Sequence, residues 1–358
     1  MVIDDHVSTR IGVLSSIFPY NSFYMPLFVF ISGYFYKERS IYLNIKHKFK
    51  HLMVPYVIWS IFGDFIAYIL MQTGIVNWYV SPFNIRSIIN LFTYTPLSTI
   101  TGAAWFVVML FWVSVIYNVL RHSLYLESKK LEYIFLAVSV ISGFICIKLC
   151  MLGYNKKSLF LFIFRTVWYL QFYHMGVMFH KYWEIYVQKA RLLTVCSLCV
   201  AINVVFILTT GNIQFTATAH MNNFHSYWIP LITSITGSMF WYKIMALLSS
   251  KIGKICIVDF LAENTFSIMC VHLIFLNLPN FYAYYQYIKK TPNYLNFPVS
   301  AFKAGAWVRY SPDTRLIGFF CGLLGSLLVV FLIHKIEFYL ATRKRTPQRS
   351  EIVIGTEE

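Results

Sequence analysis

The chain has 358 residues, of which 58% are hydrophobic, 19% aromatic and only 12% charged, and its mean hydropathy is +0.61. This composition excludes a soluble globular protein of that length and predicts an all-α, polytopic membrane helix bundle. The net charge of +16 does not indicate a nucleic-acid-binding protein. Lys and Arg lie in short segments between apolar runs and in the C-terminal tail, where attraction to anionic lipid headgroups explains most of them.

Nine apolar segments are expected to cross the membrane, although a spanning helix needs ~20 apolar residues and the first segment is short. They cover residues 20–36, 54–71, 105–120, 131–152, 159–179, 192–210, 227–248, 255–278 and 315–333. Between the second and third, residues 72–102 are more polar, and the run 84–92 has the pattern of an amphipathic interfacial helix. Residues 279–314 are predicted to form a long loop rich in Tyr, Asn and Pro.

The first two spans form a hairpin, residues 22–59, whose connecting loop carries five basic residues and one acid, Glu38. An excess of Lys and Arg marks a loop as cytoplasmic. With this loop inside, the inner segments carry 18 Lys and Arg residues and the outer segments 8, so the C-terminus is predicted to be cytoplasmic. We expect one integral membrane domain over residues 1–340 and a basic cytoplasmic tail over residues 341–358.

Seven cysteines fall within or at the ends of apolar segments, which is typical of small apolar residues and not of a disulfide framework. Cys196 and Cys199 have the CxxC spacing, but they lie inside LLTVCSLCVAI, without the context of a metal or thioredoxin site. The sequence therefore predicts no metal centre.

Several segments occur in a recognisable order. His6 ends the stretch MVIDDH, and it is followed by FYMPLFVFISGYFY, HLMVPYVIW, AAWFVVMLF, WYLQFYHMGVMFH and ENTFSIMCVH. In this order the chain resembles the acyltransferase 3 family of integral membrane O-acyltransferases, and within it the fucose acetylase type of bacterial polysaccharide-modifying enzymes. The resemblance is strongest from His6 to Phe111 and looser beyond Leu120. It implies a ten-span architecture in which MVIDDH is the end of the first helix, so that roughly one helix is missing before His6.

The resemblance implies an activity, a donor and a place in the cell. The activity is transfer of an acetyl group from cytoplasmic acetyl-CoA to a sugar hydroxyl of a cell-surface polysaccharide or its lipid-linked precursor. The implied partners are membrane lipids, the glycan acceptor and acyl-CoA, with no nucleic acid, and the implied location is the bacterial cytoplasmic membrane. Two departures from the family pattern, His51 in place of an Arg and the absent Arg-bearing start of the first helix, indicate either a misplaced start codon or a degenerate copy.

Histidine chemistry suits the proton transfer that this reaction needs. An imidazole titrates near neutral pH and can take the proton of a sugar hydroxyl. His6 lies beside Asp4 and Asp5, whose carboxylates could orient it; spacing alone favours a solvated terminal histidine, and the resemblance favours a catalytic base. His272 is assigned a catalytic role mainly by the resemblance. It shares a helix face with Thr265, whereas Glu263 lies half a turn out of phase.

Donor binding is assigned to residues of the basic hairpin. Lys46, Lys48 and Lys50, with His51 beside them, are suited to the phosphates of coenzyme A, and ordinary positive-inside topology explains the same lysines equally well. Ser32 and Gly33 could allow the pantetheine arm to approach the backbone, although small residues in membrane helices more often serve helix packing.

Polar groups at membrane depth are costly, about 2.5 to 3.5 kcal/mol on insertion scales, and call for an explanation. Asp64 and Arg165 are expected either to line the acceptor path or to pair with one another, and Trp105 is a further cavity candidate that also fits an interfacial anchor. Lys148 and Lys243 are close enough to span ends to snorkel. His174 has a weaker family match than His272.

Two other classes of protein remain open at this point. A flippase or transporter of a lipid-linked glycan would also need a bundle with a few buried charges, but the chain shows no internal repeat. An inactive, truncated homologue would explain the short start.

Overall fold

The computed structural model describes residues 3, 6, 14–82, 84–93, 100–211, 213, 220–252, 255–306 and 315–345. Its regular elements are helices, as the composition predicts. In chain order they are α2 (Leu14–Ile17), α3 (Tyr20–Tyr34), α4 (Ile41–Lys48), η1 (Phe49–Met53), α5 (Val54–Gln72), α6 (Ile85–Thr93), η2 (Gly102–Ala104), α7 (Trp105–Ser123), α8 (Lys129–Met151), η3 (Tyr154–Lys156), α9 (Ser158–Met178), η4 (Phe179–Trp183), α10 (Glu184–Lys189), α11 (Leu192–Thr210), α12 (Ile229–Ile252), α13 (Cys256–Glu263), α14 (Thr265–Leu276), α15 (Leu278–Ile288), η5 (Pro292–Tyr294), α16 (Val299–Ala304) and α17 (Arg315–Arg345).

Seven helical runs among the described residues are long and apolar enough to cross a membrane, which makes this a multi-pass membrane protein. They are Ile41–Gln72, Gly102–Ser123, Lys129–Met151, Leu192–Thr210, Ile229–Ser250, Thr265–Ile288 and Leu316–Ile336. Two predicted spans, which correspond to α3 with its 15 residues and to α9, are not among these seven. The count of nine spans stays a prediction.

The basic segment of the hairpin is mostly helix, so its assignment to a loop was wrong. Ser40 caps α4, because its Oγ accepts a hydrogen bond from the N–H of Leu43 (3.5 Å), and the lysines that follow are good helix formers. Helices α4, η1 and α5 continue as one run, Ile41–Gln72. Pro55 has no N–H to donate, and the run accommodates it just after the wider π turn of η1.

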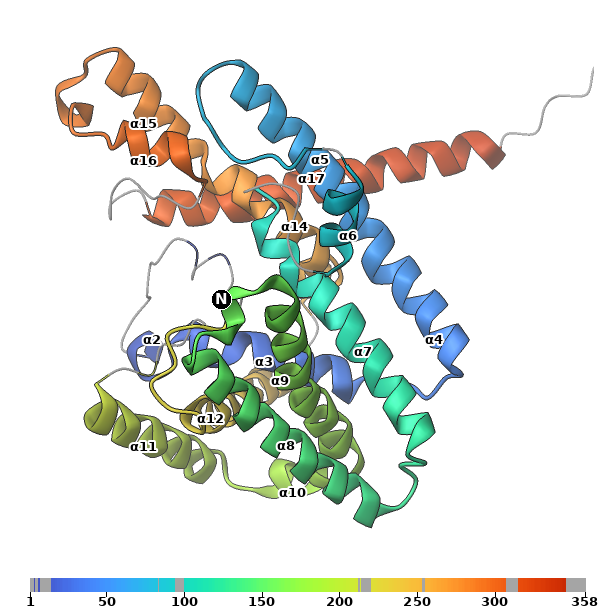
Figure 1. Ribbon diagram of the computed structural model, residues 1–358. Helices are drawn as coiled ribbons and strands as arrows, with labels where there is room; N and C mark the ends of the chain where they lie inside the picture. Colours follow the sequence, from blue (N-terminus) through green and yellow to red (C-terminus); the bar gives the residue numbers. More distant parts are fainter. Residues whose placement is uncertain are drawn as a thin grey trace, which may run out of the picture.

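The helices gather in two groups (Figure 1). One contains α3, α8, α9, α11 and α12, where α3 packs against α9 and α12, and α8 packs against α9. The other contains α5 and α14–α17, where α14 packs against α17 and α5. Helix α7 runs between the groups and contacts α4 and α9. Side chains of α7, η1, α5 and α14 share one buried cluster, and other side chains of α7 share a second cluster with α3 and α9, so α7 joins the two groups.

Helices α3 and α9 cross backbone to backbone at two glycines. A Cβ atom on Gly33 would overlap the carbonyl oxygen of Tyr173, and one on Gly176 would overlap the carbonyl oxygen of Phe30. Only glycine fits at such a crossing, where close approach gives the van der Waals contact that drives helix association in membranes.

The predicted span 255–278 is broken. Helix α13 ends at Glu263, Asn264 adopts a non-helical conformation, and α14 begins at Thr265. The Asn264 side chain donates to the Phe260 carbonyl (2.8 Å), a local bond that offers the backbone an alternative to a continuous helix. The apolar run that can cross the membrane instead extends from Thr265 to Ile288.

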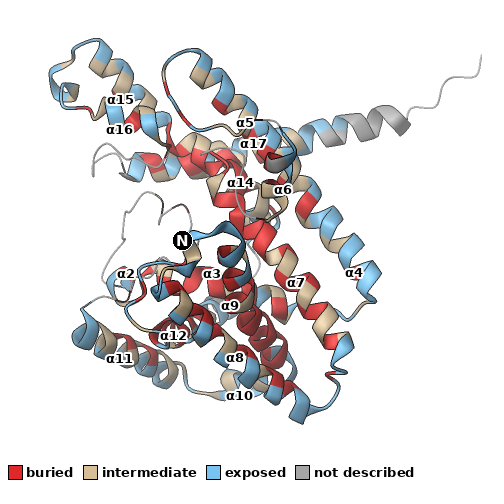
Figure 2. Cartoon of the chain, in the orientation of Figure 1, coloured by how far each residue is buried: buried red, intermediate tan, exposed pale blue. Residues whose placement is uncertain are grey.

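Burial separates central from peripheral helices (Figure 2). Helix α9 is buried along most of its length, whereas the buried residues of α11 are Cys199 and Asn203. One stripe of α8 carries apolar side chains that are about half exposed and recur every three or four residues. It consists of Ile134, Val138, Ile141 and Ile145. Such a stripe faces lipid in a membrane protein.

Candidate active site

Two histidines from opposite ends of the chain lie face to face. The ring centroids of His6 and His272 are 5.2 Å apart, and the two ring planes differ by 16°. His6 is half-buried, and His272 on α14 is fully buried. The structure therefore brings together the two residues for which the sequence predicts a catalytic role.

Helix α14 sets the orientation of His272. Its Nδ1 lies 3.2 Å from the carbonyl oxygen of Ile268, and because a carbonyl can only accept, Nδ1 carries the proton. In the neutral ring the lone pair is then on Nε2, the atom that can act as a base. Thr265 lines the same cavity as His272, which confirms the predicted common face, and Glu263 is exposed.

Ile3, three residues before His6, lies against α14 and α17. A Cβ atom on Gly322 of α17 would lie 3.3 Å from Ile3 and 2.7 Å from Leu276 of α14, so the glycine makes room for both side chains. Asp4 and Asp5, the carboxylates predicted to orient His6, lie outside the described residues.

An apolar cavity of about 190 Å³ adjoins the histidine pair. His272 forms part of its wall, and most of the other side chains are aliphatic or aromatic. The remaining lining residues are Ile3, Phe28, Leu52, Phe106, Val107, Leu110, Thr265, Phe266, Ile268 and Met269. The N-terminal segment, α3, η1, α7 and α14 thus meet around a space beside the imidazoles.

The lysines predicted to bind the donor lie on the helix that leads to this cavity. Helix α4 runs antiparallel to α7: Asn44 donates to the carbonyl of Ser114 (3.4 Å), and the Phe49 ring lies 6.3 Å from that of Phe111. Leu52 of η1 lines the cavity. At 1.5 Å per residue, Lys50 and Lys46 precede Leu52 by about 3 Å and about 9 Å along the axis.

The side chains of this basic segment differ in exposure. Lys46, Lys50 and His51 are exposed, and Lys48 is half-buried. The His51 ring stacks on that of His47 with centroids 4.2 Å apart, and its Nδ1 donates to the His47 carbonyl (2.8 Å). The lysines are therefore available to an anionic group at this flank of α4.

Ser32 and Gly33, the other predicted donor contacts, face protein. The Ser32 hydroxyl donates to the Phe28 carbonyl within α3 (2.9 Å). The position where a Cβ of Gly33 would lie is filled by the Tyr173 backbone of α9. In this structure Gly33 serves the α3–α9 packing, and the Ser32 hydroxyl is bonded within α3.

Trp105 and Arg165 form a buried contact. The Arg165 guanidinium lies 4.8 Å from the centroid of the Trp105 indole, and both side chains are buried. Trp105 thus contacts α9 inside the helix bundle, and its roles as a cavity residue or an interfacial anchor stay predictions. Asp64 is half-buried on α5, next to Gly63, which packs against Thr101.

Of the two lysines expected to snorkel, Lys148 is exposed and Lys243 is buried. The Lys243 ammonium donates to the carbonyls of Val187 (2.9 Å) and Ala190 (2.8 Å) at the end of α10. Lys243 therefore caps a helix, because the last carbonyls of a helix have no intrahelical partner.

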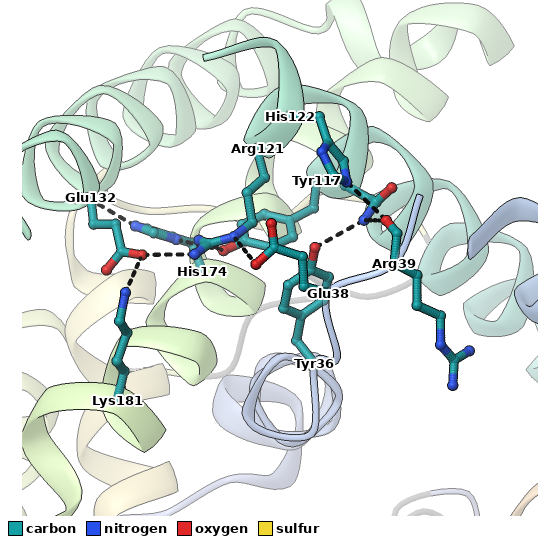
Figure 3. A network of polar contacts seen from close by, with 10 residues as sticks. Tyr36, Glu38, Arg39, Tyr117, Arg121, His122, Glu132, His174 and Lys181 are labelled. Carbon is teal, nitrogen blue, oxygen red and sulfur yellow. Dashed lines mark hydrogen bonds and ion pairs between the residues drawn. The ribbon is translucent and has the colours of Figure 1, made fainter. Parts of the chain in front are cut away.

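A second polar group surrounds Glu132, at the end of the bundle where α7 ends and α8 begins (Figure 3). The fully buried Glu132 carboxylate lies 3.1 Å from Arg121 Nη2 and 3.1 Å from Lys181 Nζ. Burial acts to lower the pKa of Lys181, but hydrogen bonds with Tyr182 and Glu132 raise it overall. Glu38 contributes a second carboxylate, 4.0 Å from Arg121 Nε.

His174 belongs to this Glu132 cluster, not to the histidine pair. Its Nε2 donates to the backbone carbonyl of Glu132 (2.9 Å), so its Nδ1 accepts from the Tyr117 hydroxyl (3.1 Å). The same hydroxyl accepts from Arg121 Nη1 (3.4 Å). Both ring nitrogens of His174 are thus used in holding α7, α8 and α9 together.

The Glu132 cluster also holds the connection between α3 and α4 (Figure 3). Asn118 donates to the Tyr36 hydroxyl (2.9 Å) and to the Arg39 carbonyl (3.2 Å). The same carbonyl accepts from His122 Nε2 (2.8 Å). The cluster fixes the point from which α4 and its lysines extend.

Sequence reasoning missed the Glu132 cluster. It counted Arg121 and Lys181 only as markers of topology, and it gave Glu132 no role. The available signal was an acid in the first turn of a predicted span, two residues after a pair of lysines. Its partners come from other helices, so that signal could not identify them.

Among the described residues, no three His, Cys, Asp or Glu side chains gather in a way that could hold a metal ion.

Neither a search of curated proteins nor a search of solved structures returned a match. The sequence model of one family, Acyltransferase domain (Acyl_transf_3), matches residues 3–335. That match includes both histidines, α4 and the cavity, and it extends over nearly the whole chain. The chain therefore belongs to the acyltransferase 3 family of membrane acyltransferases.

Proposed function

We propose that this protein is an O-acetyltransferase that moves an acetyl group from cytoplasmic acetyl-CoA to a sugar hydroxyl of a cell-surface polysaccharide or its lipid-linked precursor. The observation that carries the proposal is the stacking of His6 on His272 beside a cavity in a chain of this family. A bacterial cytoplasmic membrane, with the C-terminus inside, is the setting in which the donor reaches the basic segment of α4.

The histidine pair supplies the base. A neutral imidazole has one ring nitrogen with a lone pair that can accept a proton, and the two rings of the pair lie with their centroids 5.2 Å apart. That imidazole takes the proton of the sugar hydroxyl as its oxygen attacks the thioester carbonyl carbon. The C–O bond forms, the C–S bond breaks, and the proton passes to the departing thiolate, which gives the ester and free coenzyme A.

The two histidines divide the work. His6 is half-buried and so is the ring that an acceptor hydroxyl can reach, which makes it the proposed base. His272 is fixed by its Ile268 bond and presents a flat face on which the His6 ring lies. It holds the plane of His6 in one orientation while the proton is transferred.

The donor is proposed to approach along α4. Its phosphates contact Lys46, Lys48 and Lys50 as point charges, and its thioester reaches toward Leu52 and the cavity. The anchoring of α4 at Arg39 by the Glu132 cluster keeps these lysines in register with α7.

The direct test measures acetyl incorporation into glycan. Membranes that contain the protein, given acetyl-CoA labelled in the acetyl group, should transfer label to an extractable polysaccharide or lipid-linked sugar in an alkali-labile linkage. Membranes without the gene are the control, and the O-acetyl content of the surface polysaccharide should fall in the same cells. Glycan that reaches the surface in reduced amount, with unchanged O-acetylation, would instead support the flippase alternative.

A further inference from the structure

We propose that the cavity beside His272 is an acyl-chain pocket, and that the enzyme accepts donors with neutral aliphatic acyl groups longer than acetyl, up to about six carbons. The inference rests on the proposed function, because it assigns the cavity to the donor of that reaction. It extends that function by naming the class of acyl group.

The position of the cavity connects it to the reacting group. His272 both stacks on His6 and forms part of the cavity wall. An acyl carbon placed at the histidine pair therefore has its chain beside the cavity. Leu52 lines the same space and follows the basic segment of α4, so a donor whose phosphates contact that segment has its acyl end here.

The volume exceeds what acetyl needs. A protein cavity of ~150 Å³ lined by aliphatic and aromatic side chains binds benzene, a group of six carbons. The cavity beside His272 measures about 190 Å³ and has the same kind of lining. An acetyl group would leave most of this space unfilled, whereas a chain of up to about six carbons fills it.

The lining also restricts the chemistry of the chain. Among the described lining residues, the polar side chains are the His272 imidazole and the Thr265 hydroxyl, and none carries a fixed charge. A dicarboxylic acyl group such as succinyl would bury its second carboxylate against Phe28, Phe106 and Leu110, and none of the described lining residues is a Lys or Arg that could pair with it, which makes its burial costly. The pocket therefore favours uncharged aliphatic chains.

The test is a series of dissociation constants, because donor binding needs no knowledge of the acceptor. The purified protein in lipid nanodiscs is titrated with coenzyme A and with its acetyl, butanoyl, hexanoyl, octanoyl, decanoyl and succinyl thioesters. Each buried CH₂ should lower Kd about fourfold as far as hexanoyl, after which Kd should stop falling. Succinyl-CoA should bind no better than coenzyme A.

Two Trp variants of α7 test whether the dependence of Kd on chain length arises in this cavity. Leu110→Trp fills the cavity, so the dependence of Kd on chain length should become flat. Ile116→Trp introduces the same side chain at a half-buried position of α7 that does not line the cavity, and it should keep the wild-type dependence.

The outcomes separate the two proposals. Acetyl-CoA and coenzyme A that bind equally, with no gain from butanoyl or hexanoyl, would overturn the acyl-chain pocket and leave the acetyltransferase proposal standing. A Kd that continues to fall through decanoyl, or a chain-length dependence unchanged in Leu110→Trp, would assign the gain to the bilayer and also overturn the pocket. Failure of every thioester and of coenzyme A to bind would overturn the proposed function itself.

Discussion

The histidine pair and the Glu132 cluster each contain a fully buried ionisable residue, His272 and Glu132, but their surroundings differ. In the Glu132 cluster each charged group faces an opposite charge within 4.0 Å, and both nitrogens of His174 are hydrogen-bonded to protein groups. The rings of the histidine pair stack on each other, and His272 forms part of the wall of a cavity large enough for a small organic group. The first arrangement holds helices together, and the second leaves an imidazole beside space for a substrate.

If the histidine pair carries the activity and the Glu132 cluster the stability, replacing a histidine should have the largest effect on the transfer rate. Replacing His6 or His272 with Ala should lower the acyl transfer rate about 10²- to 10⁴-fold, the usual contribution of a positioned base. His334→Ala, which removes an exposed histidine of α17, should leave the rate unchanged. Label transfer from acetyl-CoA measures this, and full activity in His6→Ala would remove His6 from the mechanism.

Glu132→Ala should lower the stability of the protein, whereas the histidine variants lower its activity. It leaves Arg121 and Lys181 without their shared carboxylate, and breaking such a buried pair costs about 3 kcal/mol in the free energy of unfolding. Thermal unfolding in detergent should show a lower midpoint, whereas Glu127→Gln, at an exposed position in the preceding loop, should not. An unchanged midpoint in Glu132→Ala would show that the cluster does not hold the bundle.

Gly33→Ala tests whether Gly33 serves the packing of α3 against α9. The added methyl overlaps the Tyr173 carbonyl, so the helices must separate at a cost of about 2 kcal/mol. Gly305→Ala is the matched control, since an added Cβ there meets no atom within 4 Å. If Gly33→Ala changed donor KM and left the unfolding midpoint alone, Gly33 would belong to the donor site instead.

The smallest effect is expected from the lysines of α4 and η1. Simultaneous replacement of Lys46, Lys48 and Lys50 by Gln should raise the KM for acetyl-CoA about fivefold, because charge contacts that are open to solvent are each worth a few tenths of a kcal/mol. The unfolding midpoint should stay the same. Lys156 and Lys157 lie between α8 and α9, and their replacement by Gln provides a control. An equal KM in both variants would show that Lys46, Lys48 and Lys50 do not bind the donor and only set the topology.

The sequence was most informative where a feature is local. Apolar runs predicted most of the helices, and the helical period correctly put Thr265 and His272 on one face. The order of motifs predicted the family that the match over residues 3–335 confirms. It also selected both histidines, although their contact could not be seen in a linear chain.

The errors came from tertiary contacts and local breaks. The apolar pattern of residues 255–278 continues past Asn264 without interruption, so it does not predict the break there. The Asn264 side chain forms a local hydrogen bond at the break, and hydrophobic periodicity cannot predict such a bond. The basic residues before Pro55 led to the prediction of a loop, because their charge indicates a loop more strongly than their helix propensity indicates a helix. The contact between Trp105 and Arg165 joins two helices, so no pattern along the chain could show it.

The central claim is that His6 and His272 act as one unit, and a double-mutant cycle tests it most directly. The rate of acetyl transfer is measured for the wild type, His6→Ala, His272→Ala and the double variant, with the amount of folded protein held equal. Residues that work as a unit are strongly non-additive, so the double variant should be no slower than the slower single variant. A double variant whose loss equals the product of the two single losses would show that the stacked rings act independently, and would contradict the account.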